Sequence, residues 1–379
     1  MIYLDNNATT PVDPQVLSAM MPFWQDQFAN PSSPYQSAHA PALAVDDARR
    51  SIRRDLHAES FRLIFTSGGS ESNALALRGV LSHGQQRRRG VIVSTTEHAS
   101  VRQLAQELSQ EGWPVHWLRV LPSGVPDLDH LAELLDEEIA LVSVMAANNE
   151  TGVLGPLDAV ANLVHEAGAL LHSDAAQIPG RIPFDAGGSG ADLISICGHK
   201  LHGPKGIGGL LLRQPVKVKP LIFGGDQEEG LRAGTENVAG IAGFAMAMTL
   251  AVTDGLAALP QVRWLRDRLE ETVVERLAGV RIAGKDAPRL PNTTMLVIDG
   301  VQSESLLARL DQEGIQASAG SACNAGAVEP SPVLLAMGYD VSARASLRIS
   351  LSRTSTETEV EMATSALIDA IRFLRGNRQ

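Results

Sequence analysis

The feature of this sequence that most limits its fold is a regular alternation of apolar runs and helix-like segments between residues 61 and 213. The runs are short and continuous, which is typical of strands buried on both faces of a parallel sheet that helices cover. They span residues 62–67, 91–95, 115–120, 140–146, 170–174, 193–196 and 207–212. The pattern predicts an α/β fold with a mostly parallel seven-stranded sheet, whose site lies at the carboxyl ends of its strands.

Length and composition predict the domains and the compartment. A chain of 379 residues is too long for one ordinary core. We expect a large domain at 13–260 and a smaller α+β domain formed by 1–12 and 261–379. The net charge of −11 argues against nucleic acid or an anionic membrane as the main partner. No basic leader is present and no stretch approaches the ~20 apolar residues of a membrane span, so the expected location is the cytoplasm.

The most informative stretch is DLISICGHKLHGPKGIGGLLLR at 192–213. Lys200 ends an apolar strand beside His199, where burial would lower the pKa of its amine toward use as a nucleophile. A surface lysine at a strand end is the alternative. Asp174 ends another apolar strand upstream, and a strand-end Asp beside a strand-end Lys suits pyridoxal phosphate, which takes a Schiff-base lysine and an acidic partner for its ring nitrogen.

Other strand ends carry polar residues with a possible binding role. Gly69 and Ser70 lie where a strand stops and a helix begins, a place suited to phosphate, although such a serine is more often only a helix cap. His98 could stack on a planar cofactor ring or remain an ordinary polar residue. Asn149 lies in an Asn-rich turn. Thr235 lies in a glycine-rich segment that reads either as a solvated loop or as one presenting an anion-binding residue, perhaps across a subunit boundary.

The two cysteines differ in their surroundings. Cys197 ends an apolar strand and is expected to pack as a small hydrophobic residue. Cys323 lies in ASAGSACNAGA at 317–327, which contains no large apolar side chain. That composition suits a mobile loop with an accessible thiol.

Together these segments resemble the cysteine desulfurases of the nitrogen-fixation and iron-sulfur-cluster branch. These are pyridoxal phosphate enzymes of the aspartate-aminotransferase fold type. The resemblance runs over nearly the whole chain, with many motifs in the same order. The motifs are YLDNNATTPVDP at 3–14, NPSS at 30–33, FTSGGSES at 65–72, TEHAS at 96–100, NNETGVL at 148–154, HSDAAQ at 172–177, GHKLHGPKG at 198–206, RAGTEN at 232–237, GSACNAG at 320–326 and LRISLSR at 347–353.

The resemblance implies a role for each matching residue. Lys200 is the lysine that carries the cofactor, with Lys205 as the competitor, and Cys323 is the nucleophile that takes sulfur from L-cysteine as a persulfide, with alanine released. The implied cofactor ligands are Asp174, Gln177, His98, Ser70, Gly69, His199 and Asn149. Thr235 is implied as a phosphate ligand from the neighbouring subunit, hence a homodimer. Arg348 and Asn149 are implied to hold the substrate carboxylate, and His98 to assist proton transfer. Cys197 stands where the family usually has a serine, which puts one phosphate bond in doubt.

Several other functions remain open from the sequence. An aminotransferase or a selenocysteine lyase would keep the fold and cofactor; the thiol loop argues against the first, and the second differs only in chalcogen. A metal-binding protein could use His172, Asp174, Cys197, His199 and His202, although their spacing is not that of a zinc module. A non-catalytic homologue is disfavoured because the implied catalytic residues are present. The sulfur acceptor is expected to be a protein, in iron-sulfur assembly or another thio-modification, of unknown identity.

Overall fold

The computed structural model describes residues 1–83, 88–319, 331–339 and 344–376. All seven predicted apolar runs form strands of one sheet, whose order is β2-β8-β7-β6-β5-β3-β4. Only β8 runs antiparallel to its neighbours, so the prediction of a mostly parallel seven-stranded sheet is confirmed. The strands are β2 (Phe61–Thr66), β3 (Gly90–Ser94), β4 (Val115–Leu118), β5 (Ile139–Ser143), β6 (Leu170–Asp174), β7 (Leu193–Cys197) and β8 (Gly208–Arg213).

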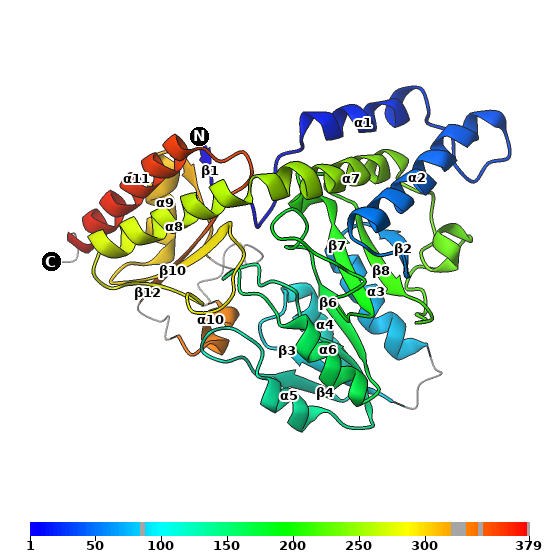
Figure 1. Cartoon of the computed structure of the whole chain (residues 1–379), viewed down its shortest axis with the longest axis horizontal. Coiled ribbons are helices and arrows are strands. Elements are labelled where there is room, and N and C mark those ends of the chain that lie inside the picture. Colours follow the sequence, from blue (N-terminus) through cyan, green and yellow to red (C-terminus); the bar gives the residue numbers. More distant parts are fainter. Residues whose placement is uncertain (84–87, 320–330, 340–343, 377–379) are drawn as a thin grey trace.

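Helices cover both faces of this sheet (Figure 1). Along β2, the side chains of Leu63 and Phe65 enter one core cluster and that of Ile64 enters another, because successive side chains of a strand point to opposite faces. Both faces are therefore buried, which explains the uninterrupted apolar runs. The first cluster includes α1 (Pro14–Gln25), α2 (His39–Asp55), α5 (Leu128–Leu134), α6 (Leu157–Glu166) and α7 (Val238–Leu250), and the second α3 (Gly69–Ser82) and α4 (Ala99–Gln110).

Helix α7 corrects one expectation from the sequence. Together with the π-helical turn Ala251–Gly255, it makes an 18-residue segment that is long and apolar enough to cross a membrane by length and composition. More than half of this segment is buried, and α7 packs on both α1 and α2. Its surface is apolar all round because protein surrounds it, as in a core helix.

A second, smaller sheet has its own core. Strand β10 (Thr293–Asp299) pairs antiparallel with β9 (Val280–Ile282) and β12 (Arg344–Ser350). The helices α8 (Leu259–Arg276), α9 (Ser303–Gln312) and α11 (Glu357–Gly376) gather beside this sheet, and α10 (Pro332–Ala336) lies below it in Figure 1. The short parallel pair β1 (Ile2–Tyr3) and β11 (Ile315–Gln316) joins the N-terminus to this half. Two-residue strands leave no periodic signal, and the sequence analysis does not predict them.

The topology gathers several strand ends at one edge. Strands β3, β5, β6 and β7 are parallel, and β2 shares their direction because β8 is antiparallel to both β2 and β7. Their carboxyl ends therefore meet at the same edge of the large sheet. The chain after each of these ends carries a predicted site residue.

Candidate active site

Lys200 lies directly after β7, in the single 3-10 turn Gly198–Lys200. Its amine donates a hydrogen bond to the backbone carbonyl of Asn7, which comes from the N-terminal segment. Burial lowers the pKa of the Lys200 amine to about 8. The side chain is thus desolvated, as the strand-end position predicts, whereas the alternative Lys205 is exposed.

Asp174 ends the neighbouring strand β6 and is 6% exposed. Its two carboxylate oxygens accept from the Asn73 amide at 2.8 Å and from the Ala176 backbone N–H at 3.0 Å. The carboxylate is held rigidly, and each oxygen keeps further acceptor capacity. An acidic partner for a cationic ring nitrogen needs this arrangement.

A chain of hydrogen bonds connects Asp174 to His98. The Asn73 amide that donates to Asp174 also donates to Ser100 Oγ at 3.0 Å, and Ser100 Oγ lies 2.8 Å from His98 Nδ1. The Ser100 backbone N–H also donates to Nδ1 at 3.2 Å, because His98 caps α4. In the neutral imidazole the ring proton is therefore on Nε2.

The start of α3 lies next to the end of β7. A Cβ built on Gly69 would lie 3.8 Å from the Cβ of Cys197, so the backbone of this helix start approaches the lysine-bearing strand closely. Ser70 is exposed in the first turn, where helix N–H groups have no intrahelical partner. Cys197 is 2% exposed, and burial raises the pKa of its thiol to about 11. It packs as a small hydrophobic residue, as predicted.

Gln177 and His199 both contact the N-terminal segment. The Gln177 amide N–H donates to the Asn7 carbonyl at 3.0 Å, while its buried Oε1 has no hydrogen-bond partner among the described residues. His199 Nδ1 lies 3.2 Å from Thr9 Oγ1. Burial, with the nearby lysines, lowers the pKa of His199 to about 4, so its imidazole is neutral at physiological pH.

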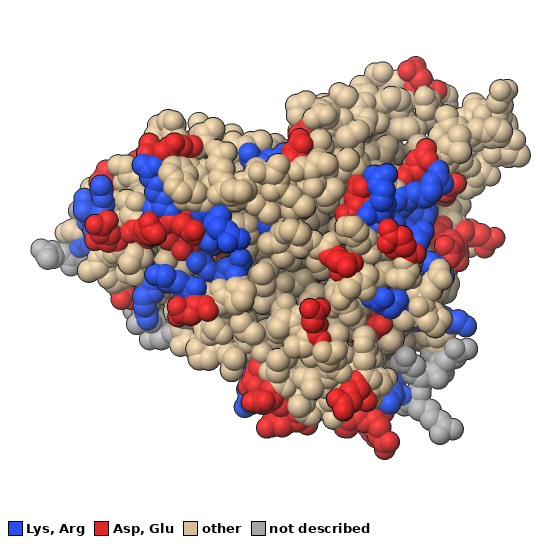
Figure 2. Space-filling model, in the orientation of Figure 1, with Lys and Arg blue, Asp and Glu red and all other residues tan. Residues whose placement is uncertain are grey.

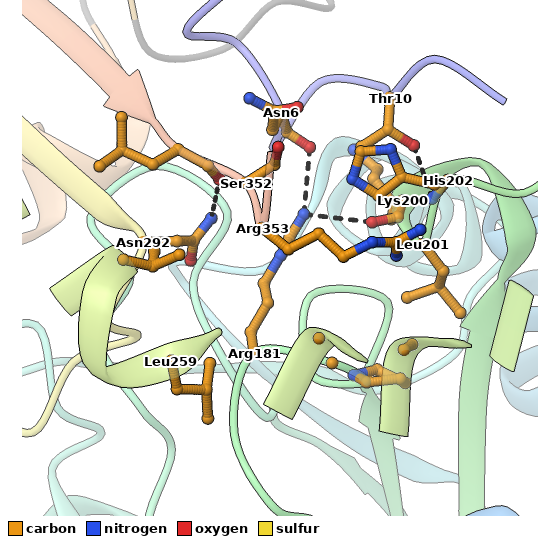
Figure 3. Close-up of a pocket in the computed structure, with 16 residues that line it drawn as sticks. Asn6, Thr10, Arg181, Lys200, Leu201, His202, Leu259, Asn292, Ser352 and Arg353 are labelled. Carbon is orange, nitrogen blue, oxygen red and sulfur yellow. Dashed lines mark hydrogen bonds between the residues drawn. The ribbon is translucent and has the colours of Figure 1, made fainter. Parts of the chain in front are cut away.

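A buried arginine supports these segments from behind (Figure 3). The guanidinium of Arg181 donates to the carbonyls of Asn6 at 3.0 Å, Lys200 at 3.4 Å and Gln177 at 3.4 Å. It lines a small cavity together with Arg353, but neither Asp174 nor Gln177 lines that cavity. The cavity therefore lies behind Lys200, and burial lowers the pKa of Arg181 to about 10.

Arg348 approaches the site from β12 of the smaller sheet and is 1% exposed. Its Nη2 donates to Asp5 Oδ1 at 2.7 Å and its Nη1 to the Asn149 carbonyl at 3.0 Å. The structure thus brings Arg348 and Asn149 into direct contact. The Asn7 amide also donates to the Asn149 carbonyl, at 3.1 Å.

The two remaining predicted site residues are Thr235 and Cys323. Thr235 is exposed in the segment between β8 and α7. Cys323 lies outside the described residues.

The metal-binding alternative gains no support. Within the described chain, no group of three or more His, Cys, Asp or Glu side chains could hold a metal ion. His172 is buried between Ser143 Oγ at 2.9 Å and Ser195 Oγ at 3.0 Å, so both ring nitrogens are occupied. Burial lowers the pKa of His172 to about 4.

Four residues of the cluster were not singled out by the sequence analysis. Asn7, Asn73 and Glu97 each fall inside or beside a quoted motif, but nothing in their residue type marks them as buried. Arg181 follows HSDAAQ by only four positions. Asn7 contributes chiefly a backbone carbonyl, for which sequence carries no side-chain signal.

Comparison with known proteins agrees with this geometry. Residues 2–362 match the family described as Aminotransferase class-V. The cysteine desulfurase NifS of Azotobacter vinelandii is 42% identical over 362 residues, covering 95% of this chain and 90% of that protein. A solved structure titled NifS-like protein superposes with a TM-score of 0.90 at 35% identity, covering 98% of this chain and 99% of the other.

A second solved structure, titled SspA in complex with cysteine, has a TM-score of 0.81 at 30% identity and covers 94% of this chain and all of its own. The family and these relatives depend on pyridoxal phosphate. The agreement extends over nearly the full length of the chain and so includes both the large and the smaller sheet. The chain belongs to the class-V aminotransferase family and, within it, to the NifS-type cysteine desulfurases.

Proposed function

We propose that this protein is a cysteine desulfurase that takes sulfur from L-cysteine, releases L-alanine and carries the sulfur as a persulfide on Cys323. The observation that carries the proposal lies at the edge of the large sheet, where the half-buried Lys200 has an amine with a pKa of about 8 beside the rigidly held carboxylate of Asp174. The likeness to NifS and to a cysteine-bound relative gives the substrate.

The residues at this edge fit pyridoxal phosphate. Gln177 Oε1 is buried without a described partner, which is the sign of a polar group awaiting a ligand. The first turn of α3, with Gly69 and Ser70, offers unpaired N–H groups and a hydroxyl to a phosphate close to the end of β7. Asp174 would pair with the ring nitrogen, His98 would lie against the ring, and His199 and the partner subunit's Thr235 would add donors to the phosphate.

When bound, the cofactor supplies an electron sink that stabilises negative charge on the substrate carbon. The protein supplies the proton transfers. Lys200 would hold the cofactor covalently and then, as a neutral amine, accept and return a proton. His98, with Nδ1 occupied by Ser100, would present Nε2–H to the substrate side. Cys323 would attack the substrate sulfur as a thiolate, so that the S–S bond of the persulfide forms as the substrate Cβ–S bond breaks. The electron pair of the broken bond would stay with the carbon skeleton, which is protonated and leaves as L-alanine.

Arg348 and Asn149 are proposed to hold the substrate carboxylate. An arginine fork suits a carboxylate, and Arg348 is oriented by Asp5 and by the Asn149 carbonyl. Arg348→Lys keeps the charge but loses the fork, so the KM for L-cysteine should increase on the order of tenfold or more. An unchanged KM would show that another group holds the carboxylate.

A homodimer is proposed from an apolar surface on and after α1. Leu17, Met21, Trp24 and Phe28 are 52%, 40%, 62% and 77% exposed. Figure 2 shows almost no charged side chains over this helix. Such a patch on a single chain is typical of an interface. We further propose the domain boundaries given above, a cytoplasmic location, and no nucleic-acid or membrane partner. The sulfur acceptor is proposed to be a protein of unknown identity, in iron-sulfur cluster assembly or another thio-modification.

The proposal is tested by incubating the purified, cofactor-loaded protein with L-cysteine and a reductant while alanine and sulfide are measured. Equal amounts of both products, with a change in visible absorbance, are expected. Cys323→Ser should keep the visible absorbance of the cofactor but lose persulfide formation and turnover. Undiminished turnover in that variant would reject Cys323 as the sulfur carrier.

A further inference from the structure

A second buried carboxyl group lies at the same sheet edge, and the proposed reaction does not use it. Glu97 precedes His98 in the turn between β3 and α4, and it is 2% exposed. Its Oε1 accepts a hydrogen bond from the backbone N–H of Met145. Its Oε2 is buried and has no hydrogen-bond partner among the described residues.

Glu97 takes the place of a backbone acceptor. On either side of Met145, the N–H groups of Val144 and Ala146 donate to β6, to His172 O at 3.1 Å and Asp174 O at 2.9 Å. The Met145 N–H therefore points the other way, toward the side where β3 has already ended. The Glu97 carboxyl supplies the acceptor that a longer β3 would have supplied.

A second bond holds the same turn. The Asn148 amide donates to the carbonyl of Thr96 at 3.0 Å. The turn that presents His98 is thus attached at two points to the segment that follows β5. Loss of the Glu97 bond would leave this turn attached to that segment by the Asn148 bond.

The charges around Glu97 disfavour an ionised carboxylate. Asp174 from β6 acts against ionisation, Arg102 from α4 acts weakly in favour, and residues 144–149 contribute no titratable side chain. No described cation forms an ion pair with Glu97, and an unpaired buried charge is costly. Burial and Asp174 together raise the pKa of Glu97 to about 8.

We propose that Glu97 is a positioning residue that acts as a neutral carboxylic acid, holding the turn that carries His98 without placing a second negative charge beside Asp174. The role of His98 in this statement rests on the proposed function. The protonation state of Glu97 does not rest on the proposed function, and thermal unfolding measures it separately from activity.

Thermal unfolding tests the protonation state. An acid with a folded pKa of about 8 and an ordinary unfolded pKa of 4.5 releases a proton on unfolding between these values, so it destabilises the fold increasingly as the pH rises. The isosteric Glu97→Gln carries no such penalty. Relative to wild type at equal cofactor occupancy, the Tm of Glu97→Gln should be little changed near pH 5 and clearly raised at about pH 8.

Glu71 provides a matched control of opposite sign. Its hydrogen bonds to Arg232 and Ser67 outweigh burial and lower the pKa of its carboxyl, so it stabilises the fold above its unfolded pKa. Glu71→Gln should therefore lower the Tm at neutral pH. The proposal would be overturned if the Tm of Glu97→Gln also falls, or if it equals that of wild type at about pH 8.

Enzyme kinetics test the positioning role. Glu97→Leu removes the acceptor for Met145 and should reduce kcat on the order of tenfold to a hundredfold. Glu97→Gln restores an acceptor, so it should recover most of kcat and shift the alkaline limb of the pH profile. If the folded Glu97→Gln is as impaired as Glu97→Leu, an ionised carboxylate is required and the proposal is wrong. An inactive wild type would instead reject the proposed function and leave the unfolding test intact.

Discussion

Two clusters of buried charged side chains, one beside each sheet, are built differently. In the smaller sheet's half, Glu270 on α8 receives both Nη groups of Arg289, at 2.9 and 3.0 Å, and lies 3.9 Å from Arg266. At the edge of the large sheet, Arg181 and Glu97 are also buried and Lys200 is half-buried, but none forms an ion pair with another described residue.

This difference distinguishes charged groups that stabilise the structure from groups that can take part in proton transfer. A paired buried charge holds two elements together and stays ionised. An unpaired one shifts its pKa toward the neutral form, to about 8 for Lys200 and for Glu97. Groups with pKa values near the working pH are those that exchange protons, so this contrast supports the proposal that the edge of the large sheet is the reactive region.

The largest expected effect comes from removing Lys200. Lys200→Met should reduce desulfurase turnover on the order of a thousandfold or more, because the amine that we propose to hold the cofactor and to transfer protons is lost. The stability of the Lys200→Met variant should not fall with its activity. Since burial disfavours the charged amine at pH values below about 8, the cofactor-free variant should unfold at the same or a higher temperature than cofactor-free wild type at neutral pH. A clear loss of stability would mean that Lys200 is a structural cation.

The paired cluster should behave in the opposite way. Glu270→Ala leaves the buried Arg289 without its carboxylate, while Arg266 keeps its pair with Asp267, and should lower the free energy of unfolding by about 3–5 kcal/mol. Turnover per folded molecule should be retained. The control is Glu361→Ala, which breaks an exposed pair with Arg268 and should cost at most about 1 kcal/mol in urea unfolding. Equal losses in both variants would remove the contrast between buried and exposed pairs.

Arg181 and Arg353 line the same cavity, so an unpaired and a paired charge can be compared there (Figure 3). Among the described residues, Arg181 donates hydrogen bonds to carbonyls alone and lowers the pKa of Lys200, whereas Arg353 is paired with Asp13. Loss of the Arg181 charge makes a protonated nitrogen on Lys200 less unfavourable. Arg181→Gln should therefore raise the pH midpoint of the bound cofactor's visible absorbance by about one unit, and Arg353→Gln by much less. Equal shifts would assign the effect to the whole cavity.

The smallest expected effect concerns the chain from Asp174 to His98. Ser100→Ala removes the hydroxyl between Asn73 and His98, and should lower the free energy of unfolding by about 1 kcal/mol and kcat a few-fold. Ser109→Ala, an exposed change on the same helix, serves as control and should alter neither quantity. If both variants match wild type, the hydroxyl does not orient the imidazole.

Much of the fold could be predicted because both faces of the large sheet are buried. Uninterrupted apolar runs located all seven strands, with 170–174 matching Leu170–Asp174 at both ends. The predicted site residues Lys200, Asp174 and His98 follow these strands, so topology alone brings them to one edge.

The rest depends on contacts between distant parts of the chain. The carbonyl of Asn7 meets the Lys200 amine across 193 positions, and a backbone group has no sequence signature. In the sequence, Glu97 resembles an ordinary polar turn residue. Its burial depends on packing against the segment that follows β5. The sequence shows how apolar α7 is, but its place in the protein core depends on packing against α1 and α2.

The most direct test of the account is to locate the cofactor on the chain. The cofactor-loaded protein would be reduced with borohydride, digested, and the peptide carrying the pyridoxyl group identified by mass spectrometry. The account predicts modification at Lys200, the half-buried amine that follows β7 and has a lowered pKa. Modification at the exposed Lys205, or no modified peptide, would contradict it.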